Sequence, residues 1–157
     1  MPKVGDMAPD FEAASDEGKS VSLKALRGRK VALYAYPRDE TPGCTVEACG
    51  IRDDYQALMA AGVVVLGVSP DSVESHRKFK ENHKLPFALL ADEDYKVAEA
   101  YGVVSMKGDR KRIHRTTFLI GPDGTITNVF ENVNPQGHSK EILAAFSDSA
   151  GGPPATS

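Results

Sequence analysis

The chain contains two cysteines, Cys44 and Cys49, and the residues before the first give it an unusual setting. Thr41 is a favoured helix N-cap residue, and Pro42 suits the first helical position, where its missing N–H costs nothing. We therefore predict a helix over residues 42–61, with Cys44 in its first turn. Free backbone N–H groups and the positive end of the helix dipole favour a thiolate at that position. Because a thiolate is a nucleophile, the pattern indicates cysteine redox chemistry.

The apolar pattern of this helix separates the two cysteines. Cys44 begins a stripe with the spacing of one buried helix face, which continues with Ala48, Ile51, Tyr55, Leu58 and Met59. Cys49 is rotated by about 140° from Cys44 and shares its side with polar residues, namely Arg52, Asp53 and Gln56. A permanent disulfide between two cysteines so close in sequence would close only a short loop and add little stability, and a reducing compartment keeps thiols reduced. The pair therefore favours catalytic or transient redox use.

A helix N-terminus alone does not ionise a thiol fully. A thiol with a pKa of about 8.5 is only a few per cent thiolate at pH 7, whereas one with a pKa near 6 is about 90% ionised. The difference corresponds to roughly 3.4 kcal/mol, which is more than a helix end usually contributes. We therefore expect a cation beside Cys44.

The segments around this helix predict an α/β fold. The apolar runs at 31–36 and 63–68 are typical of central strands, and with the helix between them they form a βαβ unit with parallel strands. A hairpin over 115–131 and a last helix near 139–146 follow. The other predicted elements are an N-terminal hairpin at 11–23 that covers one sheet edge, helices at 72–83 and 92–102, an extended piece at 87–90 and a polar connection at 103–112. We expect a central mixed sheet of four or five strands, flanked by helices.

Length and composition limit the domain organisation. The chain has 157 residues, of which 41% are hydrophobic and 26% charged, so one globular domain can bury a sizeable core. We assign this domain to residues 1–147. Residues 148–157 are small and rich in proline and glycine, and we predict a disordered tail there.

Composition and motifs also exclude several kinds of partner. With 19 basic and 22 acidic residues the net charge is −3, so no broad basic surface suits nucleic acid or an anionic membrane. The basic run at 107–112 is interpreted as a solvated loop without a binding role. No signal peptide and no stretch of ~18 apolar residues is found, so we expect a cytoplasmic protein, and a monomer, since no long exposed apolar edge stands out. Neither phosphate-binding glycine motif occurs, and the four histidines are widely spaced, so we expect no cofactor and no metal.

The loop before the helix carries a resemblance to a known family. The pattern Pro37-x-x-x-Thr41-x-x-Cys44 resembles the active-site loop of the peroxiredoxins. The run from Thr41 to Thr45, Thr-Pro-Gly-Cys-Thr, with a second cysteine at Cys49, is similar to the bacterioferritin-comigratory or peroxiredoxin Q subgroup. This resemblance covers about residues 3 to 147. It implies a thioredoxin-like fold and the reduction of hydroperoxides by cysteine chemistry alone.

The resemblance also implies a role for each residue of the site. Cys44 would attack the peroxide as a thiolate, and Arg115 would be the expected cation. Thr41 would hydrogen-bond to the sulfur and to peroxide oxygen, while Pro37 would shield the thiolate from water. Cys49 would condense with the resulting sulfenic acid to form an intramolecular disulfide. An external dithiol protein, thioredoxin or a glutaredoxin, would then reduce that disulfide.

Each of these residues has an ordinary structural reading as well. Thr41 can be a simple helix cap, Pro37 a strand-ending proline and Arg115 a surface charge. Two other functions also remain open. A thiol–disulfide oxidoreductase is disfavoured because the cysteines are not in CxxC and no proline precedes the strand at 116–120. A non-enzymatic redox sensor or holdase would be oxidised once and stop, whereas a peroxidase turns over.

Overall fold

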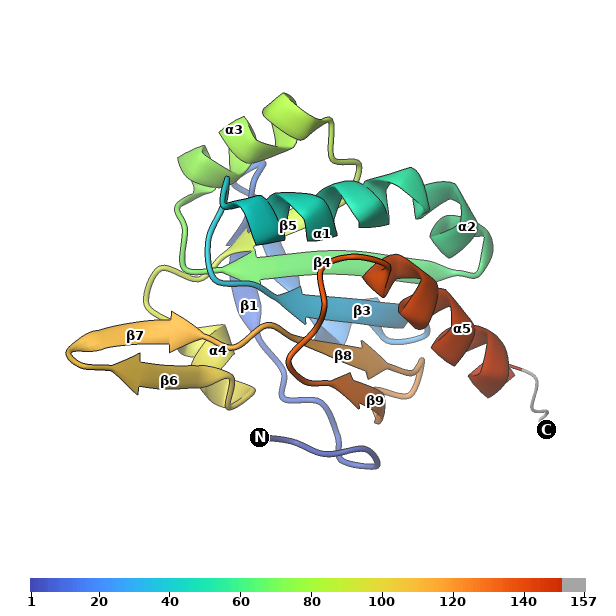
Figure 1. The fold of residues 1–157 in the computed structure, drawn as a ribbon. Coiled ribbons are helices and arrows are strands. Elements are labelled where there is room, and N and C mark those ends of the chain that lie inside the picture. Colours follow the sequence, from blue (N-terminus) through green and yellow to red (C-terminus); the bar gives the residue numbers. More distant parts are fainter. Residues whose placement is uncertain (151–157) are drawn as a thin grey trace.

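A computed structural model of the protein describes residues 1–150, with side chains up to residue 146. Its centre is a seven-stranded mixed sheet in the order β2-β1-β5-β4-β3-β8-β9 (Figure 1). The parallel strands in the middle are β3 (Lys30–Ala35), β4 (Val63–Ser69) and β5 (Ala88–Ala91). Antiparallel strands complete both sides: β1 (Glu12–Ser15) and β2 (Ser20–Ser22) next to β5, and β8 (Thr116–Ile120) and β9 (Ile126–Phe130) next to β3. The predicted α/β class with a mixed sheet is confirmed.

The predicted number of four or five strands is too low. The N-terminal hairpin does lie at one sheet edge, but β1 pairs directly with β5, so that Ala14 faces Ala91 and Ser15 faces Leu90. The hairpin therefore extends the sheet by two strands. The alternation within β1 and β2 is too short to reveal this pairing in the sequence.

Helices cover both faces of the sheet, because the central strands are apolar on both sides. On one face lie α1 (Pro42–Asp53), α2 (Tyr55–Ala60), α3 (Val73–His83) and α5 (His138–Ala150), packed on Ala32 and Tyr34 of β3. On the other face lie the 3₁₀ turn η1 (Lys24–Leu26) and α4 (Lys96–Ala100). They share an apolar cluster with Val31 and Leu33 of β3. Figure 1 shows α1 running along the sheet.

The predicted helix over 42–61 is two helices. The chain leaves helical geometry at Asp54, whose carboxylate accepts a hydrogen bond from Ser139 Oγ of α5 at 2.6 Å. The predicted buried stripe is correct at Ile51 and Leu58, which are fully buried, but wrong at Met59, which is 59% exposed. Leu58 follows Ile51 by seven residues and stays on the stripe, whereas Met59, eight residues after Ile51, is rotated about 80° from it and faces solvent.

The segment predicted as a polar connection at 103–112 contains a two-stranded sheet. It consists of β6 (Val104–Lys107) and β7 (Arg110–Ile113), joined by a turn in which Gly108 has a φ of +64°. Within β7 only Ile113 is buried. The sequence prediction failed because these strands, which are largely exposed, lack apolar alternation.

Two predicted helix boundaries also change. The helix expected over 92–102 is shorter, because Asp92 lies before α4 and its carboxylate accepts hydrogen bonds from the N–H groups of Val97 and Ala98, both at 2.9 Å. At the other end of the chain, α5 continues to Ala150 rather than ending near 146. Most of the predicted tail at 148–157, from residue 151 on, lies outside the described residues. Within residues 1–150, every helix is too short or too polar to cross a bilayer.

Candidate active site

Cys44 occupies the first turn of α1 and is 1% exposed, at the start of the buried stripe as predicted. Thr41 is the N-cap residue, with φ −80° and ψ 152°, and its carbonyl accepts the first helical hydrogen bond from the N–H of Thr45 at 2.9 Å. Pro42 follows at the first helical position. The amide groups of this first turn have no partners within the helix, so they point positive dipoles toward the thiol.

The expected cation beside Cys44 is present. Arg115 Nη2 donates to Cys44 Sγ at 3.3 Å. The sheet explains this contact: Thr116, the first residue of β8, pairs with Ala35 at the end of β3, so Arg115 lies beside the loop that leads to α1. Its side chain is only 17% exposed. A partly buried guanidinium at this distance stabilises negative charge on the sulfur.

Glu47 is a site residue that the sequence analysis missed. Its Oε1 accepts from Arg115 Nη1 at 2.7 Å, and its side chain is fully buried. Its second oxygen has no hydrogen-bond partner among the described residues. Burial raises the pKa of Glu47 to about 7, although the charge of Arg115 acts in the opposite direction. The available signal was its position three residues after Cys44, which puts a carboxylate near the buried face and requires a cationic partner.

Thr41 and Pro37 lie on the loop that precedes α1. The hydroxyl of Thr41 donates to the carbonyl of Arg38 at 3.0 Å, so its one proton is used within the loop rather than for Cys44, and its oxygen accepts from no helix amide. A rotation of the side chain is required before Thr41 can donate to the sulfur. Pro37 is half-buried and follows directly on the buried Tyr36.

Cys49 lies on the same helix as Cys44 but is half-buried, and both side chains are free thiols. It shares its side of α1 with Arg52, which is also half-buried, and with the exposed Asp53, as predicted. Arg52 Nη1 donates to the carbonyl of His83 at 2.7 Å and so ties the end of α1 to α3. The two thiols are held apart as long as α1 remains a regular helix.

A comparison with known families identifies this arrangement. The AhpC/TSA family profile matches residues 4–129. The chain belongs to this family. The peroxiredoxin Bcp of Bacillus subtilis is 42% identical over 150 residues, which cover 93% of this chain and 96% of that protein. A Coxiella burnetii protein with the provisional name peroxiredoxin bcp is 50% identical over 145 residues, covering 90% of this chain and 96% of that protein.

Solved structures give the same result. Peroxiredoxin Q of Xanthomonas campestris superposes with a TM-score of 0.86 at 33% identity, covering 89% of this chain and 91% of that one. Peroxidoxin BcpB of Mycobacterium tuberculosis superposes with a TM-score of 0.87 at 32% identity, covering 92% and 96%. The predicted family and thioredoxin-like fold are therefore confirmed. Since peroxiredoxins are thiol-dependent peroxidases, this protein is an oxidoreductase of that class.

This peroxiredoxin has an open cleft of about 1050 Å³ beside the active-site loop. Pro37, Arg38 and Thr41 line one wall, and the β6–β7 hairpin lines the other with Lys107 and Arg110. In Figure 1 the hairpin projects from the end of the molecule where α1 begins. The basic run interpreted as a solvated loop thus faces the active-site loop.

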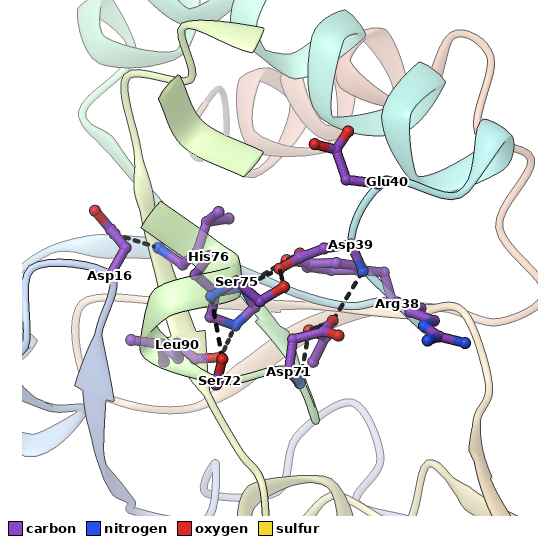
Figure 2. A network of polar contacts seen from close by, with 12 residues as sticks. Asp16, Arg38, Asp39, Glu40, Asp71, Ser72, Ser75, His76 and Leu90 are labelled. Carbon is purple, nitrogen blue, oxygen red and sulfur yellow. Dashed lines mark hydrogen bonds and ion pairs between the residues drawn. The ribbon is translucent and has the colours of Figure 1, made fainter. Parts of the chain in front are cut away.

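A second polar cluster lies behind the same loop. Asp39, Asp71 and His76 each offer a ligand atom, and these atoms lie within 4.8 Å of one another. The sequence predicted no metal, since the histidines are far apart along the chain. The fold brings His76 together with two carboxylates that the search for histidine spacings did not consider. Figure 2 shows that hydrogen bonds connect these three residues with their neighbours.

Proposed function

We propose that Cys44 is the thiol of this peroxiredoxin that reacts with the peroxide and is oxidised by it. The observation that carries the proposal is the hydrogen bond of 3.3 Å from Arg115 to Cys44 Sγ, at a helix N-terminus. The thiolate attacks the terminal oxygen of the hydroperoxide and the O–O bond breaks. Cys44 becomes a sulfenic acid, and the leaving oxygen takes a proton and departs as water or an alcohol.

Arg115 stabilises the charge that moves from sulfur to the leaving oxygen, together with the free amides of α1. Glu47 holds one end of the guanidinium, so the other end stays directed at the sulfur. Thr41 contributes once its hydroxyl turns from Arg38 toward the peroxide, and Pro37 shields the sulfur from water. The contact of Arg115 with Cys44 supports its role, and the family resemblance supports the roles of Thr41 and Pro37.

We further propose that Cys49 resolves the sulfenic acid. Its thiol attacks the sulfur of Cys44, and an intramolecular disulfide forms with release of water. An external dithiol protein then reduces this disulfide by thiol exchange, and thioredoxin is the reductant that the family resemblance favours. In an intact helix the Cα atoms of residues five apart are roughly 9 Å apart, whereas a disulfide requires about 7 Å or less. Oxidation therefore includes an opening of α1.

Organic hydroperoxides are proposed as substrates beside hydrogen peroxide. The bacterioferritin comigratory protein of Xanthomonas campestris, whose structure superposes with a TM-score of 0.84 at 32% identity, is described with an alkyl peroxide reduction activity. The open cleft beside Thr41 leaves space for an alkyl group in this protein.

A peroxide-consumption assay with and without a thioredoxin system tests these proposals. We expect sustained turnover only with the complete system, and no reaction for Cys44→Ser. Consumption of a single equivalent followed by a permanent stop would indicate a redox sensor instead. Reduction of protein disulfides without peroxide consumption would indicate a thiol–disulfide oxidoreductase.

A cytoplasmic location and a monomeric state are proposed as well. Two cysteines only five residues apart favour transient redox use in a reducing compartment over a permanent structural disulfide. Of the large exposed apolar side chains, Val46, Met59 and Met106 belong to separate elements and Met1, Val4 and Met7 to the N-terminal segment, which disfavours one association surface built from all of them. Analytical ultracentrifugation of the reduced and oxidised protein tests the monomer.

A further inference from the structure

A buried carboxylate lies in the middle of the active-site loop. Asp39 accepts hydrogen bonds from Tyr36 Oη at 2.6 Å and from Ser75 Oγ at 2.8 Å, and His76 Nδ1 lies 2.7 Å from its Oδ2. Its backbone N–H donates to Asp71 Oδ2 at 2.8 Å. Figure 2 shows Asp39 directed from the loop toward Ser75 and His76 on α3. The loop is thereby attached to α3 and to the turn before it.

The partners of His76 determine its protonation state. Nε2 lies 2.8 Å from the carbonyl oxygen of Leu90, which can only accept, so Nε2 carries a proton. Nδ1 faces Asp39, a carboxylate that already accepts two hydroxyl protons, so Nδ1 donates too. Burial lowers the pKa of His76, but the hydrogen bond and the charge of Asp39 outweigh this effect and raise it. Both ring nitrogens of His76 therefore face oxygen acceptors, the carboxylate of Asp39 and the carbonyl of Leu90.

The next residue of the loop is held by the same helix. Glu40 is a non-glycine residue with a φ of +62°, in the left-handed region that such residues seldom adopt. Its carboxylate accepts from Asn82 Nδ2 at 2.6 Å and lies 2.8 Å from His83 Nε2. Thr41 follows immediately. The unusual backbone turn that leads into α1 is therefore fixed from both ends of α3.

We propose that His76 is a positioning residue for peroxide reduction, which acts through Asp39 to hold the backbone of the active-site loop and the start of α1. His76 does not touch the sulfur, and nothing in the sequence motif of the loop points to it. The inference rests on the proposed role of Cys44. The contact with Asp39 is almost completely buried, with side-chain exposures of 0% and 2%, so water cannot replace the hydrogen bond when it is lost.

Two substitutions of His76 separate its contacts. The side-chain amide of asparagine lies where Nδ1 lies, so His76→Asn retains a donor to Asp39. The amide of glutamine reaches the position of Nε2, so His76→Gln retains a donor to Leu90 O but loses Asp39. Neither amide side chain can carry a positive charge, so the two variants do not differ in charge. They differ in whether they keep the hydrogen bond to Asp39 or the one to Leu90, and a comparison of their rates therefore tests the hydrogen bond to the loop.

The measurement is the rate of peroxide consumption in a single turnover, in a Cys49→Ser background that isolates the first step. We expect His76→Gln to react at least tenfold more slowly and His76→Asn to stay within about threefold of the parent protein. Amide exchange should increase in residues 39–46 for His76→Gln only, with β4 unchanged. Equal rates for the two variants, whether slow or normal, would overturn the proposal.

Two further variants keep the test decisive. Asp39→Asn retains the shape of the side chain and should reproduce the slow reaction even where His76→Gln folds poorly. Glu81→Gln, at an exposed position of the same helix, is the matched control and should react normally. A normal rate for Asp39→Asn would refute the role of the pair. If the Cys49→Ser parent protein consumes no peroxide, the proposed role of Cys44 fails instead, so the two failures are distinguishable.

Discussion

The substitution Gly50→Ala tests whether α1 opens during each catalytic cycle. Gly50 lies within α1, and a Cβ atom at this position would meet no other atom within 4 Å outside its own helix. The alanine side chain therefore fits without a clash. Because alanine is about 1 kcal/mol better than glycine in a helix interior, the substitution stabilises the closed helix relative to the opened one.

The expected size of the effect follows from this difference. If the disulfide forms only from the opened helix, a stabilisation of about 1 kcal/mol lowers the population of that state roughly fivefold. Disulfide formation should slow by the same factor. The first step takes place in the folded site and should keep its rate, so it provides the internal control. Because the sulfenic acid waits longer for Cys49, a larger fraction should become sulfinic acid.

The assay is a peroxide pulse followed by rapid quenching with acid and mass spectrometry of the sulfenic, sulfinic and disulfide forms. Val46→Ala provides a second, independent case, since Val46 is 45% exposed and alanine again favours the helix. We expect Val46→Ala to slow disulfide formation by about two- to threefold. Unchanged disulfide formation in both variants, with increased protection of α1 amides confirmed by hydrogen exchange, would refute the opening mechanism.

Four further predictions concern individual groups. Cys49→Ser should consume about one equivalent of peroxide and then stall with thioredoxin, and undiminished turnover in that assay would contradict a resolving role. Arg115→Ala should slow peroxide consumption by at least tenfold. Arg115→Lys should have an intermediate rate, because an amine cannot contact both Cys44 and Glu47. If both variants react as fast as the parent protein, Arg115 is only a surface charge. Between pH 4.5 and 7 the native state holds a proton on Glu47 that the unfolded chain has lost, so Glu47 should lower the free energy of unfolding by up to about 3 kcal/mol as the pH rises. Urea unfolding at pH 5 and 8 measures this loss, which should be smaller in Glu47→Gln. On oxidation, amides 45–52 should lose protection from hydrogen exchange while α2 keeps it, and equal protection would exclude the opening.

The position of Cys44 could be predicted from the sequence because local rules determine it. A cap residue, a proline and a glycine before a cysteine define a helix start within five residues, and the strand before it ends at a proline. The need for a cation followed from the energy of ionising a thiol. The family resemblance then identified Arg115, which local patterns alone would have left as a surface charge.

The rest depended on contacts between distant segments. His76 lies 37 residues from Asp39, and its role appears only when α3 packs beside the active-site loop. Asp54, where the helix is interrupted, accepts a hydrogen bond from Ser139, 85 residues away. Glu47 was missed for another reason, since a carboxylate on an apolar helix face is unfavourable until its partner, Arg115, is known.

The interruption at Asp54 also has a consequence for protein engineering. The twelve residues of α1 end there and carry both thiols. The loop before α1 is joined to α3 through Asp39, and the other end is joined to α3 through Arg52 and to α5 through Ser139. Stiffening the protein beyond these contacts, for example at α2 or in the sheet, should raise the melting temperature without slowing turnover. In many enzymes heat resistance and activity oppose each other, because the moving part and the core are the same. In this protein we expect separate substitutions to change heat resistance and activity independently.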